Sequence, residues 1–383
     1  MTSVTPTPLP EMLDPCAEID APAATNLVWK EDWPEARRAL ASWWDGNGLA
    51  LHVTAPREIP AEELPPPPDV SPSQARLNIR VRLHAEAYRL SRTFFGGVAA
   101  PIFNGNIGGP GSLGLFLGAE GHITPDTVWY SACIQDPELH PRLHFDPGNL
   151  WWKRHFDTLT VARTESRGRW LVAAPDLVEN LDTLAQLRGT EAVLMDLIER
   201  PDWIHKTIED INEAYFECFD ALWLLIRDTW DGGAFHAFQL WGPGKTAKVQ
   251  CDFCCMISPS MFRKFVQPAL TRQCAWLDYP MFHLDGTQAV PQLDNLLAID
   301  SLRAIEWTPQ AGLPGGGSPQ WYDLYRRIRA AGKSVQAIDV RPDEVEPLIE
   351  AVGEKGLFIV TQTETEAQAR DLLDRVGWRT AGY

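Results

Sequence analysis

The stretch 279–307, YPMFHLDGTQAVPQLDNLLAIDSLRAIEW, decides the fold class because it contains one complete structural unit. Residues 279–285 form a short apolar run that ends in a polar residue followed by a glycine, which is typical of a β-strand. A helical stretch follows at 290–299, and a second strand-like run lies at 302–307. Two strands joined through one short helix predict a parallel pair, because a parallel connection needs a crossover.

The same alternation of strand and helix recurs along the chain from about residue 95. Seven or eight such units, without a dinucleotide-binding glycine fingerprint after the first strand, predict an α/β protein folded as a single closed (β/α)₈ barrel. The helical region 190–230 is expected to be an insertion or a pair of consecutive helices. The strand-like runs lie at 99–104, 169–177, 234–241, 279–285, 302–307, 334–339 and 356–362.

The first quarter of the chain differs from the rest in composition. Residues 1–25 are rich in Pro, Thr and Ala and are expected to be poorly ordered. Residues 26–94 are predicted to form a helical and irregular extension that includes the proline-rich loop 55–73. The barrel is expected to span residues 95–383.

The composition narrows the functional classes. The 383 residues include 34 Lys and Arg and 51 Asp and Glu, which gives a net charge of −17. This charge opposes binding to nucleic-acid backbones and to anionic membranes, because like charges repel. The sequence shows neither a long apolar run nor a secretory signal, and its 7 cysteines are scattered. A reduced, cytoplasmic protein is therefore expected.

A barrel of this kind predicts where the chemistry lies. Functional side chains of such barrels occur at the carboxyl ends of the strands. The polar and aromatic residues at those positions are therefore candidates for substrate binding or catalysis. They are Asn104, Asn106, Asp176, Trp241, His283, Asp285, Glu306, Trp307, Asp339 and the segment 361–363.

The strongest cluster among them combines His283, Asp285 and Glu306. Residues i and i+2 of a strand point the same way, so His283 and Asp285 share one side. Glu306 ends the next strand, and neighbouring parallel strands lie about 4.8 Å apart. One imidazole and two carboxylates suit Zn²⁺ or another divalent metal with an open position. Metal-free catalysis or binding, and a structural polar rim, are the other two interpretations.

Other segments suggest binding residues. The motif GPGKT at 242–246 lacks the full phosphate-loop pattern, yet Lys245 could meet an anionic group. The glycine-rich loop 104–114 could approach a ligand closely, or its glycines could serve only the turn. Arg188 could meet a carboxylate of the substrate, or form a salt bridge at a helix end.

The cysteine motif CDFCC at 251–255 is compatible with two readings. Cys251 and Cys254 have the spacing of half a zinc site, but no second pair supports it, and cysteine also packs well in cores. Just after Cys255, Ser258 is predicted to cap a helix that begins with a proline.

Five stretches of the chain resemble the uroporphyrinogen decarboxylase superfamily. The stretch ISPSMFRKFVQPAL at 257–270 resembles its SPxMFxxFVxP helix, and the others fit the same group in the same order. These are FNGNIGGPGSLGLFLGAE at 103–120, LAQLRGTEAVLMDLIERPDWI at 184–204, MFHLDG at 281–286 and LLAIDSLRAIEWTPQAG at 296–312. The resemblance spans roughly residues 85–378 and implies a single barrel. It also implies one of several activities, which include porphyrin decarboxylation and zinc-dependent methyl transfer to corrinoid proteins, thiols or folates.

The sequence departs from the methyltransferase pattern at the sulfur ligands. The resemblance places His283 on the zinc-binding His and Glu306 near the Glu of the related methionine synthase barrel. Asp285 stands where a Cys is expected, and Thr361 and Thr363 stand near the position of a late Cys. A harder N/O site favours activation of water or of an oxygen-bearing substrate.

These observations predict a metal-dependent methyltransferase or demethylase of a small substrate, with His283, Asp285 and Glu306 as metal ligands. A corrinoid protein is an expected partner, and the superfamily is often dimeric. The first alternative is a metal-free decarboxylase of a tetrapyrrole-like or small aromatic acid, in which Asp176 and His283 stabilise charge and Arg188 or Lys245 anchors carboxylates. The second is a barrel that binds a ligand without turnover.

Overall fold

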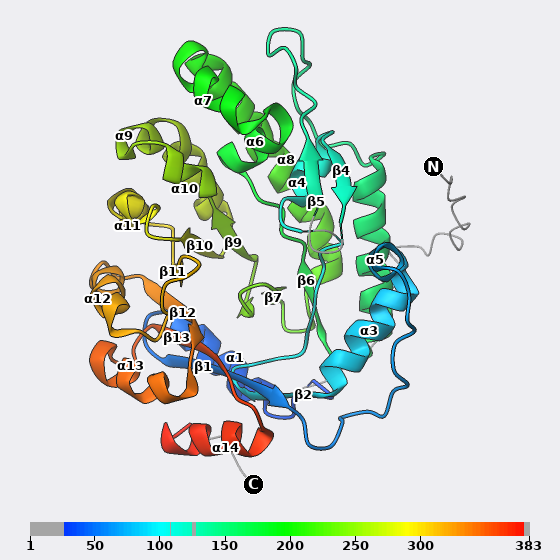
Figure 1. Ribbon diagram of the computed structural model, residues 1–383, viewed down its shortest axis with the longest axis vertical. Helices are drawn as coiled ribbons and strands as arrows, with labels where there is room; N and C mark the ends of the chain where they lie inside the picture. The colour runs from blue at the N-terminus through cyan, green and yellow to red at the C-terminus, as the bar shows by residue number, and fades with distance from the viewer. Residues whose placement is uncertain (1–26, 108, 125–127, 379–383) are drawn as a thin grey trace.

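The computed structural model describes residues 27–107, 109–124 and 128–378 of the chain. It is a mixed α/β protein in which the strands lie along the inner side of an arc and helices lie along its outer side (Figure 1). The predicted α/β class is therefore confirmed.

A seven-stranded sheet holds the larger group of strands, in the order β2, β1, β13, β12, β11, β10, β9. Neighbouring strands are parallel, except that β1 and β2 are antiparallel. The strands are β1 (Leu49–Pro56), β2 (Thr93–Gly97), β9 (Thr246–Gln250), β10 (Tyr279–Asp285), β11 (Ala304–Thr308), β12 (Ser334–Val340) and β13 (Leu357–Gln362).

A second sheet of four strands has the order β3, β6, β7, β8. Its first three strands are parallel and β8 is antiparallel to β7. Within the described residues no strand ladder joins the two sheets into one ring, so a closed barrel is not shown. The strands are β3 (Ile102–Phe103), β6 (Leu171–Ala174), β7 (Gly233–Phe235) and β8 (Leu240–Gly242), and a separate hairpin contains β4 (Glu120–Ile123) and β5 (Val128–Ser131).

Helices follow most strands and cover the outer side of the arc (Figure 1). The helical region 190–230 is a pair of consecutive helices, because Pro201 begins a second helix directly after the first. The helices are α1 (Trp33–Trp44), α2 (Pro72–Leu77), α3 (Ile79–Ser91), α4 (Ser112–Phe116), α5 (Leu150–Ser166), α6 (Asn180–Arg188), α7 (Thr190–Glu199), α8 (Pro201–Ile226), α9 (Pro259–Met261), α10 (Gln267–Trp276), α11 (Leu293–Leu297), α12 (Tyr322–Ala330), α13 (Val345–Val352) and α14 (Glu366–Arg375).

One predicted strand is wrong in detail. The run 234–241 is not one strand but the two short strands β7 and β8, which reverse direction through Gln239 at a φ of 53°. The strand that pairs with β10 is β9, at 246–250. Polar Lys248 and Gln250 alternate there with Ala247 and Val249, which obscured a strand that is buried at every position.

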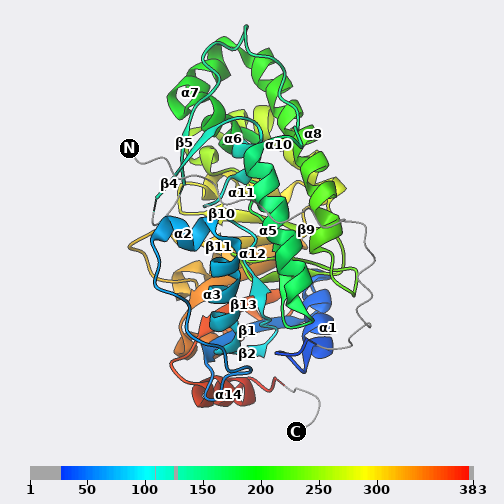
Figure 2. The same ribbon diagram turned by 90° about the vertical axis from the view of Figure 1, so that its right-hand side faces the viewer.

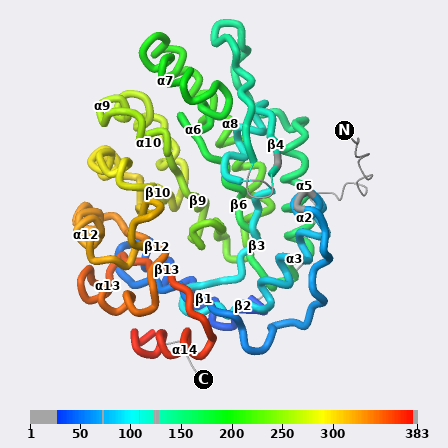
Figure 3. Tube along the Cα trace, viewed as in Figure 1, coloured from blue at the N-terminus to red at the C-terminus, as the bar shows by residue number. Residues whose placement is uncertain are grey.

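The N-terminal segment contributes directly to the main sheet. Strand β1 pairs in parallel with β13, so residues far apart in the chain lie side by side (Figure 3). The pairing runs from Leu49 with Leu357 to Thr54 with Gln362. The segment 26–94 therefore supplies a strand as well as helices.

The inner faces of the strands divide into an apolar and a polar half. At their amino ends, small and apolar residues such as Met281, Ala304 and Phe358 pack against the tryptophans of α1, including Trp43. Two residues further along β10 and β11 the same face becomes polar, at His283 and Glu306, because side chains alternate with period two. The apolar half thus forms a floor, and the polar half above it positions the site.

None of the helices in the described part of the chain has the length and apolar character needed to cross a bilayer.

Candidate functional site

His283 and Glu306 lie side by side on β10 and β11. Their Cα atoms are direct partners in the parallel register. Nδ1 of His283 donates to Oε2 of Glu306 over 2.5 Å, and Oγ1 of Thr308 donates to Oε1 of the same carboxylate over 2.7 Å. Glu306 is fully buried, so both of its oxygens are satisfied inside the protein. This contact orients the imidazole and leaves its Nε2 for another partner.

Asp252, His283 and Asp285 form a cluster with the spacing of a metal site. One ligand atom from each lies within 4.8 Å of the other two. Gln250 on β9 is the register partner of His283 on β10. Asp252 follows Gln250 by two residues, as Asp285 follows His283, so the two carboxylates lie at the same end of the neighbouring strands. The sequence predicts Glu306 as the third member, whereas the structure places Glu306 behind His283 and brings Asp252 into the cluster.

The turn that carries Asp252 is held by the carboxylate of Asp182, in the first turn of α6. Oδ2 of Asp182 accepts from the backbone N–H of Asp252 and Oδ1 from that of Phe253, both over 2.8 Å. Nε2 of Gln250 bridges the two carboxylates, with 2.9 Å to Asp182 and 3.0 Å to Asp252. Partial desolvation and the nearby Asp182 raise the pKa of Asp252 to about 6.

A buried ion pair lies next to this cluster. Nζ of Lys248 is 2.7 Å from Oδ1 of Asp176, with 3% and 6% of the two residues exposed. Burial lowers the pKa of Lys248, but the carboxylates of Asp176 and Glu179 outweigh burial and raise it. Burial also raises the pKa of Glu179 to about 8. Lys248 is therefore a buried ammonium held in place by the opposite charge of Asp176.

The pKa of His283 is set by the same competition. Burial lowers the pKa of the imidazole, but the Glu306 carboxylate outweighs burial and raises it. The proton on Nδ1 is therefore held firmly between the two residues. A second contact comes from the ring of Phe238, whose centroid is 4.8 Å from that of His283.

Three of the predicted residues meet at the carboxyl ends of β3 and β6. Oδ1 of Asn104 accepts from the backbone N–H of Asn106 over 2.9 Å, and Oδ1 of Asn106 accepts from the N–H of Asp176 over 2.6 Å. Since Asp176 pairs with Lys248, this chain of contacts leads to the polar cluster on β9 and β10.

Three other candidates lie in structural roles away from that cluster. Trp241 packs against α1 in the apolar floor, where its Nε1 donates to Asp228 over 2.7 Å. Lys245 pairs with Asp220 over 2.5 Å. Arg188 pairs with Asp196 over 2.9 Å, which is the helix-end salt bridge considered as its alternative role.

Trp307 and Asp339 also lie outside the cluster. Trp307 is fully buried and packs on Trp321, with ring centroids 4.9 Å apart. Asp339 is exposed near the end of β12 and has a φ of 53°. Neither residue belongs to the group of Asp252, His283 and Asp285.

The three cysteines of the CDFCC motif are thiols rather than ready metal ligands. Cys251 and Cys254 are buried and Cys255 is exposed. Burial raises the pKa of all three, which disfavours the thiolate that a metal needs.

Besides Asp252, sequence reasoning missed Lys248, Gln250, Glu179 and Asp182. The signal for the first two was present, because polar and apolar residues alternate along 246–252 as they do in a strand with one polar face. Glu179 and Asp182 lie at the start of α6 and have no comparable pattern. Their proximity to β9 depends on how α6 packs on η1 (Asp252–Met256).

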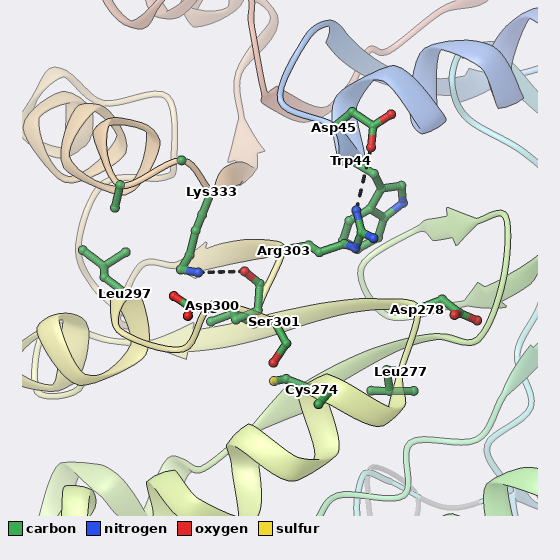
Figure 4. Close-up of a pocket in the computed structure, with 14 residues that line it drawn as sticks. Trp44, Asp45, Cys274, Leu277, Asp278, Leu297, Asp300, Ser301, Arg303 and Lys333 are labelled. Carbon is green, nitrogen blue, oxygen red and sulfur yellow. Dashed lines mark hydrogen bonds and ion pairs between the residues drawn. The ribbon is translucent and has the colours of Figure 1, made fainter.

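A depression lies elsewhere, at the amino ends of β10, β11 and β12 (Figure 4). It has a volume of about 670 Å³ and is lined in part by Asp278, Arg303 and Lys333. Nζ of Lys333 donates to two backbone carbonyls, at 2.7 and 2.8 Å, and Arg303 pairs with Asp45 at 3.7 Å. Ligands of parallel sheets bind at the carboxyl ends instead, so we place the candidate site at Asp252, His283 and Asp285.

Comparisons with known proteins support the fold alone. No protein-family model matches the chain, and no curated protein matches it by sequence. A methyltransferase from Methanosarcina mazei has a similar solved structure, with a TM-score of 0.56 and 11% sequence identity. The match covers 89% of this chain and 97% of that one, so nearly the whole of both molecules shares one architecture.

Proposed function

We propose that the chain is a metal-dependent methyltransferase or demethylase of a small substrate, with the fold of the uroporphyrinogen decarboxylase superfamily. The observation that carries the proposal is the cluster of Asp252, His283 and Asp285 within 4.8 Å at the carboxyl ends of β9 and β10. The sequence motifs and the shared architecture with a protein named a methyltransferase support it.

The donor set fits a divalent cation. Nδ1 of His283 is bound by Glu306, which leaves Nε2 for a metal, as is usual where a carboxylate orients a ligating imidazole. Asp252 and Asp285 are both exposed and each supplies a carboxylate oxygen. Nitrogen and oxygen donors suit Zn²⁺ and harder divalent ions. A bound cation would polarise the heteroatom that carries or receives the methyl group.

The protein's own residues would hold protons and charge around this cation. Glu306 would keep His283 in one tautomer and orientation through Nδ1. Lys248, held by Asp176, would place a fixed positive charge beside the reacting heteroatom. Asp182 would keep Asp252 in position by binding the backbone that carries it.

Methyl transfer needs a donor and an acceptor. In a demethylation, the bond between the methyl carbon and the substrate heteroatom breaks, its electron pair stays on the heteroatom, and a nucleophile forms the new bond to carbon. We propose a corrinoid-carrying protein as the partner that provides this nucleophile or the methyl group.

The metal is tested by elemental analysis of protein purified without a tag. We expect about one divalent ion per chain, and Zn²⁺ affinity at least tenfold lower in His283→Ala and Asp252→Asn. His144→Ala, at an exposed histidine, is the matched control. Wild-type protein without affinity for Zn²⁺, Mn²⁺ or Co²⁺, or unchanged binding in His283→Ala, would refute the proposal.

A second candidate is metal-free decarboxylation, and the buried pair of Lys248 and Asp176 favours it specifically. In that reaction the bond to the carboxyl carbon breaks, CO₂ leaves, and the electron pair that stays on the substrate takes a proton from Nζ of Lys248. Turnover that survives metal removal and is abolished in Lys248→Met would support this candidate. Saturable binding without turnover, with or without metal, would instead indicate a ligand-binding protein.

A further inference from the structure

Arg82, on the inner side of α3, is a buried cation that forms no salt bridge with any residue the structure describes. Only 9% of the residue is exposed. Nη2 donates to the backbone oxygen of Asn104, whereas Nη1 has no hydrogen-bond partner in the described part of the chain. Its other close contact is the ring of Phe103, 5.5 Å from the guanidinium carbon. Most of the charge is therefore desolvated, and the Glu86 carboxylate offsets only part of that cost.

Such an arrangement is unfavourable in the free protein. A buried charge normally has an opposite charge and a full set of hydrogen bonds, because desolvation costs several kcal/mol otherwise. Burial lowers the pKa of Arg82 to about 10, which is consistent with a strongly desolvated guanidinium. An arginine kept in this state is suited to bind an anion that arrives from outside.

The surroundings of Arg82 offer a place for that anion. Arg82, Asn104 and Asn106 line a depression of about 240 Å³ at the carboxyl end of β3. The side-chain oxygens of both asparagines already accept from backbone N–H groups, and no hydrogen bond engages their NH₂ groups within the described residues. The three side chains therefore present donors in excess of acceptors, which suits an acceptor-only ligand.

We propose that this depression binds the carboxylate of a monoanionic substrate and holds the rest of that substrate over Lys248 and the Asp252–His283–Asp285 cluster. A planar carboxylate matches the planar fork of a guanidinium. Arg76 and Glu86 also line the depression and offset each other in charge, which leaves the single charge of Arg82 to be met by a monoanion. A carboxylate is therefore favoured over a phosphate.

The position of the depression connects it to the reactive residues. Helix α3 packs beside α5 (Figure 2). Asn106 binds the backbone of Asp176, whose carboxylate pairs with Lys248. The inference that an anion binds here depends only on Arg82 and its surroundings. The inference that this anion is part of the substrate rests on the proposed function.

The test measures binding of benzoate and of inorganic phosphate by calorimetry, in Tris chloride, to the full-length wild type and three variants. Arg82→Gln removes the charge, and Arg82→Lys keeps it but loses the planar fork. Arg80→Gln makes the same charge change at an exposed position on α3. We expect benzoate to bind the wild type, at least tenfold more weakly to Arg82→Gln, several-fold more weakly to Arg82→Lys, and within twofold of wild type to Arg80→Gln.

The outcomes separate this inference from the proposed function. Benzoate binding that persists in metal-free protein and in His283→Ala supports the anion site even if no metal is ever bound. Equal losses in Arg80→Gln and Arg82→Gln, no saturable benzoate binding, or tighter binding of phosphate than of benzoate would overturn the proposal. If Arg82→Gln does not fold, Arg82→Lys decides, and benzoate affinity unchanged from wild type then counts against the site.

Discussion

At the scale of single residues, the site depends on buried groups that hold one another. One oxygen of Glu306 accepts from Nδ1 of His283 and the other accepts from Thr308. Glu306 therefore orients the imidazole and has no oxygen left to ligate a metal. Lys248 and Asp176 likewise satisfy each other out of contact with bulk water. Substitutions at these residues should therefore separate residues that position a metal ligand from residues that bind the metal themselves.

Glu306→Gln tests positioning of the imidazole. A neutral amide can still meet Nδ1, but it no longer favours the tautomer that leaves Nε2 free, so Zn²⁺ affinity should fall by about 10- to 100-fold. Competition with a chromophoric chelator measures this affinity. Thr308→Val, which removes only the hydroxyl that orients Glu306, should cause a smaller loss. Equal metal affinity in Glu306→Gln and wild type would contradict the positioning role.

Lys248→Met tests the buried ion pair. The variant strands the Asp176 carboxylate among buried groups and should lower the free energy of unfolding by about 3–5 kcal/mol, because an unpaired buried charge is strongly unfavourable. The double variant Lys248→Met with Asp176→Leu should recover part of that loss. Urea unfolding measures both, and losses that simply add would show that the two residues are not coupled.

At the scale of elements, the floor of the molecule is made by α1. Its Trp43 is fully buried and meets Phe358 of β13 edge to face, with ring centroids 5.1 Å apart. Trp43→Ala should lower the free energy of unfolding by about 3–5 kcal/mol, because it removes a large buried side chain and leaves a cavity. Arg38→Ala, at an exposed position of the same helix, should change it by less than about 0.5 kcal/mol. Urea unfolding curves of the two variants should therefore differ clearly, and similar midpoints would contradict this role of α1.

The elements also show what the sequence could predict. His283 and Glu306 were predictable as neighbours, because a strand has period two and consecutive parallel strands usually pair. Asp252 was not, because the strand before it is only five residues long and follows a hairpin that resembles a single strand. Arg82 was not predictable as part of a site, since its approach to β3 depends on how the flanking helix packs.

At the scale of the whole molecule, two buried histidines and one half-buried histidine link stability to pH. His52 on β1, His155 on α5 and His236 after β7 all have their pKa lowered to about 4 by burial. In the unfolded chain each would titrate near 6.5. The unfolded chain therefore binds more protons between these values, so the histidines stabilise the fold fully above pH 6.5 and lose that contribution as pH falls towards 4. Glu179 acts in the opposite direction, because its raised pKa of about 8 favours the folded state as pH falls from 8 to about 4.5.

His155→Gln separates the pH-dependent contribution of His155 to stability from those of the other groups. Nδ1 of His155 donates to the backbone oxygen of Trp151 over 2.8 Å, and Nε2 lies 3.2 Å from the hydroxyl of Ser112, contacts that a neutral amide can partly replace. Wild type and variant share every other titrating group, so the difference between their unfolding free energies reports His155 alone. The unfolding free energy of the wild type, relative to that of the variant, should fall by about 3 kcal/mol between pH 7 and pH 4. The reason is that the unfolded wild type gains a proton on His155 in this range, whereas the folded wild type keeps the imidazole neutral. Urea unfolding at half-unit steps of pH measures it, and a difference that stays constant with pH would show that His155 is not held neutral in the fold.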